Sequence, residues 1–176
     1  MPKTLKIGWY VLYVRSRQEK KVYNLLKDSN LEPFLPLIKT VRQWSDRKKE
    51  IETPLFPSYV FVKVNNAIDF NKALSVEGVC AYIRFGSEYA IVREPEILQI
   101  KMFLKSNEIS DIETSSQQIK IGEVRKIDFG SLKGLECKVL KVNNTNKIIV
   151  RIDSLYQNII ATIPSYHMEQ ILEEVV

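Results

Sequence analysis

Histidine, cysteine and glycine are scarce in this sequence of 176 residues, and their scarcity excludes several kinds of functional site. His167 is the one histidine, and Cys80 and Cys137 lie far apart without a C-x-x-C spacing, so no zinc motif is formed. The six glycines build neither a G-x-x-x-x-G-K-S/T phosphate loop nor a G-x-G-x-x-G turn. Acidic residues are scattered, without a nucleophile beside a base. The sequence therefore predicts a protein that is not an enzyme and holds no metal or cofactor.

Long apolar runs are also missing. No run approaches eighteen apolar residues, and the first residues lack the apolar region and cleavage site of a signal peptide. Hydrophobic residues nevertheless make up 45% of the chain, which is enough to build a core. We therefore expect a cytoplasmic protein with no membrane segment.

Positive charge is concentrated in the first part of the chain. Residues 1–105 hold 18 Lys and Arg against 11 Asp and Glu, whereas residues 122–176 hold seven of each. Residues 106–118 between them are polar and too poor in apolar side chains to pack. The sequence therefore predicts a domain over 1–105, a flexible linker over 106–120 and a second domain over 121–176.

The first domain is expected to combine strands and helices. Trp9–Val14 is apolar on both faces, which is typical of a central strand. Ser16 followed three residues later by Glu19 predicts a capping box and a helix that starts at Arg17. Further elements are predicted as a long hairpin of 31–40 with 51–64, a helix over 67–74, a second hairpin of 81–85 with 89–92, and a third helix that begins near Pro95.

The second domain contains five short apolar segments that read as strands: 124–127, 135–142, 148–152, 159–163 and 167–172. Five short strands separated by turn signals predict a small β-barrel. Cys137 falls within one of them and is expected to be a buried structural thiol.

Aromatic side chains share one face of a predicted strand. Alternation along residues 59–64 places Val60, Val62 and Val64 on one face and Tyr59 and Phe61 on the other. Periodicity alone favours ordinary core residues, and the alternative is an exposed apolar surface for a partner, with Tyr10, Phe85 and Ile97 as further candidates.

Basic residues cluster around the start of the first predicted helix, at Arg15, Arg17, Lys20 and Lys21. Such a cluster is either a solvated helix face or a surface that contacts phosphates and unpaired bases of a nucleic acid.

Three motifs in the right order resemble the NusG family: Trp9–Tyr13, Pro54–Val62, and the segment from Gly122 to Ile152 with its Gly130–Leu135 turn. The form of Pro54–Val62, together with Ile83–Gly86, is closest to the specialised paralogues RfaH and UpxY. The resemblance implies an α+β fold, with an NGN-type antiparallel sheet and helices followed by a KOW-type five-stranded β-barrel.

The resemblance also implies a function and partners. Tyr59, Phe61, Phe85 and Ile97 match positions that bind the clamp helices of the largest RNA polymerase subunit. The basic cluster matches a region that contacts the non-template DNA strand. The KOW domain would recruit a small-subunit ribosomal protein or Rho. We therefore expect a monomeric antitermination factor that suppresses pausing and termination, at long operons such as those for polysaccharide biosynthesis.

Three departures from the family pattern and two alternatives accompany this expectation. Ser16 replaces an arginine of RfaH and Glu77 stands where a second DNA-contacting arginine would be, so the recognised DNA element should differ. Asp69–Lys72 replaces the run that touches the polymerase gate loop. The alternatives are a housekeeping NusG that promotes Rho-dependent termination, and a KOW-containing RNA-binding protein.

Overall fold

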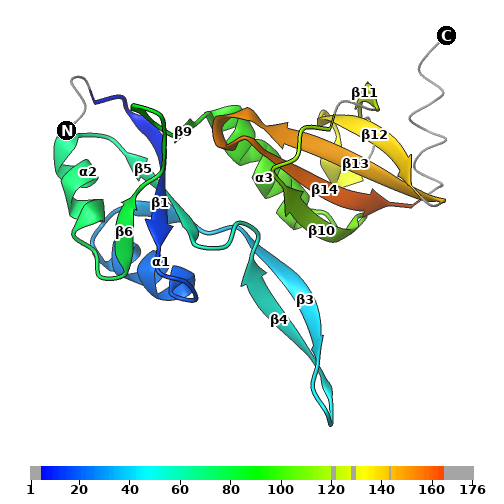
Figure 1. Ribbon diagram of the computed structural model, residues 1–176, viewed down its shortest axis with the longest axis horizontal. Helices are drawn as coiled ribbons and strands as arrows, with labels where there is room; N and C mark the ends of the chain where they lie inside the picture. Colours follow the sequence, from blue (N-terminus) through cyan, green and yellow to red (C-terminus); the bar gives the residue numbers. More distant parts are fainter. Residues whose placement is uncertain (1–4, 120–121, 128–129, 143, 165–176) are drawn as a thin grey trace. The chain divides into compact units, whose positions relative to one another are not determined.

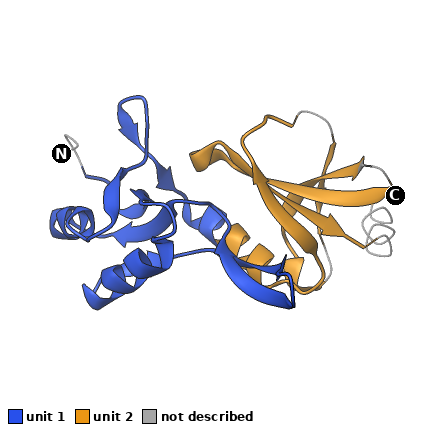
Figure 2. Cartoon of the chain, turned by 60° about the horizontal axis from the view of Figure 1, so that its bottom comes forward, with its two compact units in different colours: residues 1–97 blue, residues 98–176 orange. Residues whose placement is uncertain are grey.

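The computed structural model describes residues 5–119, 122–127, 130–142 and 144–164. It divides into two compact units, residues 1–97 and 98–176, which are coloured separately in Figure 2. Among the described residues no helix is long and apolar enough to span a bilayer.

An antiparallel sheet forms the centre of the first unit (Figure 1). Its strands, in spatial order, are β2 (Glu32–Phe34), β5 (Tyr59–Val64), β1 (Gly8–Val14) and β6 (Val79–Tyr82), and β9 (Ile91–Val92) also pairs with β1. The prediction of a central strand at 9–14 is confirmed, because β1 pairs with β5, β6 and β9.

One face of this sheet packs against the helices α1 (Glu19–Asp28) and α2 (Ala67–Leu74). The core cluster there contains Val60, Val62 and Val64 of β5, so the predicted alternation along this strand is confirmed. Stacked rings lie at its edge: Phe70 and Tyr82 are 4.2 Å apart between centroids, and the Tyr82 hydroxyl donates to the Phe70 carbonyl. Burial raises the pKa of Tyr82, so it remains a donor there.

The predicted capping box is wrong. Helix α1 begins at Glu19, two residues later than expected, and its N-cap residue Gln18 makes no side-chain capping bond. Arg17 has φ of 64°, which is outside the helical region. Glu19 is 6% exposed, and its Oε1 accepts from the Ser58 backbone N–H at 2.9 Å instead of turning back toward Ser16. A tertiary contact has replaced the local one.

Helix α2 has the expected bounds and a side-chain cap. Asn66 precedes it, and the Asn66 Oδ1 accepts from the Asp69 backbone N–H at 2.9 Å. Asp69 in turn accepts from the Asn65 N–H at 3.1 Å. Helix α3 (Glu94–Lys105) carries Pro95 in its first turn, as predicted, and buries Ile100 and Phe103.

Two hairpins extend from this framework. Strands β3 (Leu37–Gln43) and β4 (Lys48–Pro54) pair along their whole length and form a two-stranded sheet of their own. The expected partners 31–34 and 59–64 lie in the main sheet instead. The second hairpin is shorter than expected, with β7 (Arg84–Phe85) and β8 (Glu88–Tyr89) around Gly86, which has φ of 63°.

The second unit contains another antiparallel sheet, in the order β10-β14-β13-β12-β11. The strands are β10 (Ser110–Ser115), β11 (Glu123–Lys126), β12 (Glu136–Val142), β13 (Thr145–Ile152) and β14 (Gln157–Ile163). Short 3-10 helices lie at Gly130–Leu132 and Asp153–Leu155. Four strands match predicted ones. The fifth predicted strand, 167–172, lies outside the described residues.

The segment expected to be a flexible linker differs from that expectation, because it contains β10, which pairs with β14. Polar residues form this strand because backbone pairing with β14 compensates for its poor apolar content. Within the described residues β10 and β11 are the two ends of an open sheet, so the expected closed barrel is not found there. Cys137 is 3% exposed on β12, and burial raises the pKa of its thiol to about 12.

Candidate functional site

Tyr59 and Tyr13 lie at one end of the sheet face that α1 and α2 leave uncovered. They are directly opposite each other in the β1–β5 pairing. Tyr13 is 47% exposed, and Tyr59 is half-buried. Burial, and to a smaller extent the neighbouring Tyr13, raises the pKa of Tyr59, so the Tyr59 phenol remains neutral at physiological pH. This pair offers an amphipathic surface with apolar rings and hydroxyl groups.

Phe61 and Ile97 are fully buried, which differs from the expectation of an exposed apolar face. The ring of Phe61 lies between those of Phe34 and Phe56, with 5.8 Å between centroids in each pair. Aromatic rings that find apolar neighbours within their own unit lose their contact with water. In this structure neither residue presents a surface to a partner.

Trp9 shows why the middle of this face is closed. It is 3% exposed, its Nε1 donates to the Glu94 carboxylate at 2.8 Å, and its ring meets Phe34 edge-on at 6.3 Å. The bond to Glu94 fixes the beginning of α3 against β1. Tyr10, which the sequence offered as a further surface candidate, is 1% exposed and packs on the opposite face with Tyr82.

Phe85 remains accessible at a separate place. It is 39% exposed on the β7–β8 hairpin. The predicted polymerase-binding residues therefore fall into two pairs: Tyr59 and Phe85 have accessible surface, and Phe61 and Ile97 support the fold. Sequence analysis missed Tyr13, although its place opposite Tyr59 follows once β1 and β5 are paired in the observed register.

The four predicted nucleic-acid-binding residues are all exposed around the start of α1. Arg15 is held by its backbone N–H, which donates to the Gly78 carbonyl at 2.9 Å. Arg17 occupies the left-handed turn before the helix, and Lys20 and Lys21 lie in the first turn. The structure thus brings these cations together on one segment.

Carboxylates accompany two of the four cations. The Lys21 Nζ lies 2.7 Å from the Glu77 Oε1, and the Lys20 Nζ lies 3.8 Å from the Glu52 Oε2. The pKa of Glu77 is lowered mainly by the hydrogen bond from Lys21 and, to a smaller extent, by the positive charge of Lys21. Because these pairs are exposed, each is weak enough for a phosphate to replace the carboxylate. Lys20 and Glu52 also line a surface pocket of about 330 Å³ with Tyr23 and Phe34.

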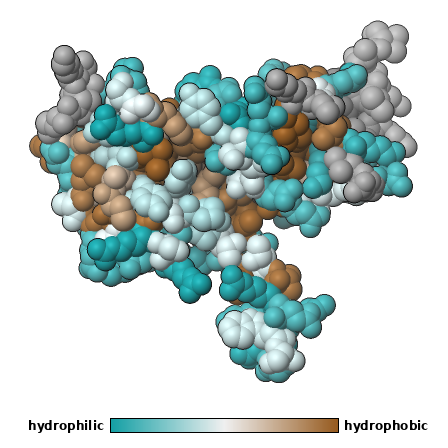
Figure 3. Space-filling model, in the orientation of Figure 1, coloured by the Kyte–Doolittle hydropathy of each residue, from teal (hydrophilic) through white to brown (hydrophobic). Residues whose placement is uncertain are grey.

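The β3–β4 hairpin is a third exposed feature of the first unit. Residues 41–50 are all exposed, and Trp44 is 57% exposed at the tip. In Figure 3 the hairpin projects with a largely hydrophilic and neutral surface. A turn bond from the Trp44 N–H to the Arg47 carbonyl, 2.8 Å long, closes the tip.

Metal-binding clusters are not found in the described part of the chain, where no three His, Cys, Asp or Glu side chains come together. Cys80 is exposed and Cys137 is buried, and the two are free thiols. His167 lies outside the described residues.

Comparison with known families identifies the class of protein first. Residues 8–101 match the family model described as "Transcription termination factor nusG", which is a family of transcription factors and not of enzymes. Since the match covers just over half of the chain, this chain belongs to the NusG family. Members of this family bind RNA polymerase.

One solved structure supports this fold. One chain titled "Domain interaction in Thermotoga maritima NusG" is 20% identical with a TM-score of 0.50, and the alignment covers 89% of this chain and 93% of that one. Two structures of an MjSpt4:Spt5 complex, conformations A and B, are 14% and 15% identical with TM-scores of 0.34 and 0.33. They align over 82% of this chain and over 86% and 84% of those chains.

Proposed function

We propose that this chain is a specialised NusG-family factor that binds the polymerase clamp helices and the non-template DNA strand and thereby suppresses pausing and termination. Its targets would be long operons such as those for polysaccharide biosynthesis. The effect would come from binding energy alone, since holding the clamp closed requires no covalent step. The observation that carries this proposal is the combination, in one NusG-family unit, of accessible aromatic residues with an exposed basic helix start.

Docking on polymerase would use Tyr59 and Phe85, with Tyr13 added to the predicted set. Their rings give apolar area at low entropic cost, and the tyrosine hydroxyls can pair with polar groups at the rim of a helical hairpin. Phe61 and Ile97 would act from beneath by holding β5 and the start of α3 in place.

DNA contact would use Arg15, Arg17, Lys20 and Lys21. A single strand exposes both phosphates and base edges, and four exposed cations on one segment can meet the phosphates. Arg15 and Arg17 would dominate, because Lys20 and Lys21 each have a carboxylate nearby.

The second unit is proposed to be a KOW-type domain that recruits a small-subunit ribosomal protein or Rho. Its four strands from β11 to β14 and the Gly130–Leu135 turn support this assignment. Closure into a five-stranded barrel would require a further pairing beyond those of the described residues.

A housekeeping NusG role is the second candidate, because the matched family model and the Thermotoga maritima structure both carry the NusG name. Genome-wide occupancy on transcribing polymerase separates the two. Occupancy restricted to a few long operons supports the specialised factor, and occupancy on nearly all genes supports the general one.

The docking proposal is tested by capture of purified RNA polymerase, without nucleic acid, on the immobilised full chain. Tyr59→Ala and Phe85→Ala should each weaken binding at least about tenfold, as expected for aromatic residues at the centre of an interface. Trp44→Ala, an exposed aromatic on the β3–β4 hairpin, is the matched control and should bind like the wild type. Undiminished binding by the Tyr59→Ala, Phe85→Ala double variant would refute the clamp assignment.

A further inference from the structure

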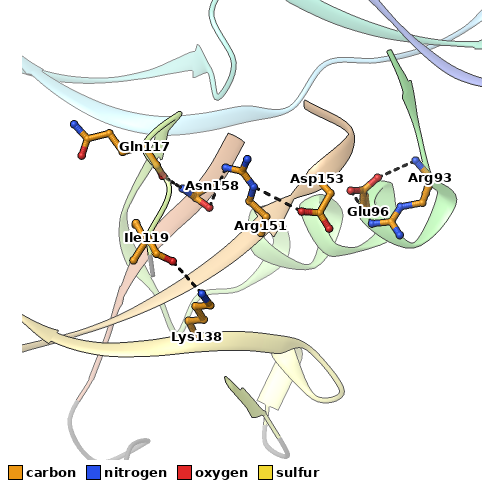
Figure 4. A network of polar contacts seen from close by, with 8 residues as sticks. All are labelled: Arg93, Glu96, Gln117, Ile119, Lys138, Arg151, Asp153 and Asn158. Atoms are coloured by element: carbon orange, nitrogen blue, oxygen red, sulfur yellow. Dashed lines mark hydrogen bonds and ion pairs between the residues drawn. The ribbon is translucent and has the colours of Figure 1, made fainter. Parts of the chain in front are cut away.

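A pocket of about 200 Å³ lies in the second unit, on the sheet face opposite its apolar core. Figure 4 shows polar side chains that line it, among them Lys138, Arg151 and Asn158. The pocket is lined by Gln118, Ile119, Lys138, Ile149, Arg151, Asp153 and Asn158. Lys138 is paired with Ile149, and Arg151 with Asn158, across neighbouring strands, so these side chains share one face. Residues 117–119 cover part of that face.

Asn158 lines the pocket and is 3% exposed. Its Nδ2 donates to the Gln117 carbonyl at 2.6 Å, which ties the covering segment to β14. Its Oδ1 accepts from Arg151 Nη1 at 3.5 Å. Because the buried Asn158 amide has two hydrogen-bond partners, its position is fixed, and it orients the Arg151 guanidinium.

The two cations of the pocket are only partly compensated. Lys138 Nζ donates to the Ile119 carbonyl at 2.9 Å, a neutral acceptor that leaves the ammonium charge in place. Arg151 Nε lies 3.7 Å from Asp153 Oδ1, beyond hydrogen-bond distance, and the Asp153 side chain is 70% exposed. Among the described lining residues Asp153 is the one carboxylate against two cations.

Hydrogen-bond donors are therefore in excess at this site. An ammonium has three donors and a guanidinium five, and the bonds among the described residues use only a few of them. The Arg151 guanidinium also makes a cation–π contact with Tyr156, at 6.0 Å from the centre of the ring. A group rich in acceptors and negatively charged would satisfy both cations at once.

We propose that this pocket binds the carboxylate of an acidic side chain on a partner polypeptide, with Arg151 and Lys138 as its two donors. A protein carboxylate fits better than a nucleic acid because residues 98–176 hold ten Lys and Arg and ten Asp and Glu, so the unit lacks the excess positive charge that a phosphate backbone requires. The pocket is also small, which suits one side chain. The proposal concerns the second unit alone and does not depend on the polymerase or DNA contacts.

The test uses the isotope-labelled full chain and three probes in NMR titrations. The first probe is a blocked tetrapeptide with two glutamates, the second is the same peptide with two glutamines, and the third is a decamer of uridylate. The glutamate peptide should shift the signals of Arg151, Asn158 and their neighbours on β13 and β14. The glutamine peptide should bind at least about tenfold more weakly, because a hydrogen bond to a charged group is lost.

Variants locate the effect. Arg151→Gln should weaken binding of the glutamate peptide about tenfold, and Lys138→Gln should weaken it severalfold. Lys141→Gln is the matched control, since Lys141 lies on the same strand as Lys138 but alternates to the other face, and it should bind like the wild type. If Arg151→Gln does not fold, Lys138→Gln still tests the site. Equal binding of both peptides, tighter binding of the uridylate, or equal effects of Lys138→Gln and Lys141→Gln would overturn the proposal.

Discussion

The Glu19 carboxylate accepts a hydrogen bond of 2.9 Å from the backbone N–H of Ser58, a residue 39 positions further along the chain. Ser58 has φ of 63° and its carbonyl accepts from the Val14 N–H, so it is held from two sides. Glu19 begins α1 in the middle of the basic cluster, between Arg17 and Lys20, and Ser58 precedes Tyr59. One buried carboxylate thus connects the two candidate binding surfaces of the first unit.

Loss of this bond should destabilise the first unit. Glu19→Ala leaves the Ser58 N–H without its partner, and we expect the free energy of unfolding to decrease by about 1–3 kcal/mol. Glu19→Gln keeps an acceptor for the Ser58 N–H, so its free energy of unfolding should decrease less than that of Glu19→Ala. Urea unfolding followed by tryptophan fluorescence measures the difference. Glu32→Ala, at an exposed glutamate on β2, is the control and should change stability by less than about 0.5 kcal/mol. Equal stability of Glu19→Ala and Glu32→Ala would show that the bond contributes nothing.

Phe61 and Tyr59 should respond differently to truncation, although they are neighbours on one strand face. Phe61 is fully buried between two rings, so Phe61→Ala should cost about 3–5 kcal/mol. Tyr59 is half-buried, and we expect Tyr59→Ala to cost clearly less while it weakens polymerase binding. Thermal unfolding and polymerase capture on the same samples separate the two effects. A stable Phe61→Ala variant that fails to bind polymerase would mean that Phe61 contacts the partner directly.

The two thiols should differ in reactivity. Cys80 is exposed, whereas Cys137 is 3% exposed and burial raises its pKa to about 12. At pH 8 a thiol reagent should therefore modify one cysteine of the folded chain rapidly and the second only after denaturation. Because the folded pKa lies above the unfolded one, the neutral thiol stabilises the fold below pH 9 and this contribution is lost as pH rises toward 12. Mass spectrometry identifies the modified residue, and rapid labelling of Cys137 in the native state would contradict its placement.

DNA binding should depend on the acid beside the basic cluster. Glu77→Gln removes the carboxylate that pairs with Lys21, so affinity for single-stranded DNA should increase, most clearly at low salt. Lys21→Gln should decrease affinity and make the slope of log K against log salt shallower by about 0.7, the value for one phosphate contact on a single strand. Glu88→Gln, at an exposed glutamate on the β7–β8 hairpin, is the charge-matched control. Fluorescence anisotropy over a salt series measures both the affinity for single-stranded DNA and its salt dependence. An unchanged slope for Lys21→Gln would remove this residue from the interface.

Strong local patterns predicted the elements that they describe. Alternating valines placed β5 and one of its buried faces, and the helix predicted over 67–74 has the observed bounds of α2. Pro95 and the apolar spacing after it placed α3. These patterns are informative because each residue's preference and its neighbours' spacing point to the same structure.

Tertiary contacts decided the places where prediction failed. Ser16 and Glu19 have the spacing of a capping box, but the Ser58 amide competes for the same carboxylate. The polar segment 110–115 has little strand preference of its own and becomes β10 because β14 offers it a backbone partner. Ser58 is distant in sequence from Glu19, and β14 is distant from β10, so no local sequence pattern indicates either contact.

The amino-acid sequence alone determined the helices and most strands, because these follow from periodicity. It also determined the uneven distribution of charge, through composition, and the membership of a family, through short motifs. Only the folded chain decided which aromatic residues are accessible. Tyr59 and Phe61 lie on the same strand face with similar rings, yet Phe34 and Phe56 enclose one and leave the other partly in solvent. Burial depends on neighbours that converge from distant segments, and that convergence is a property of three-dimensional packing.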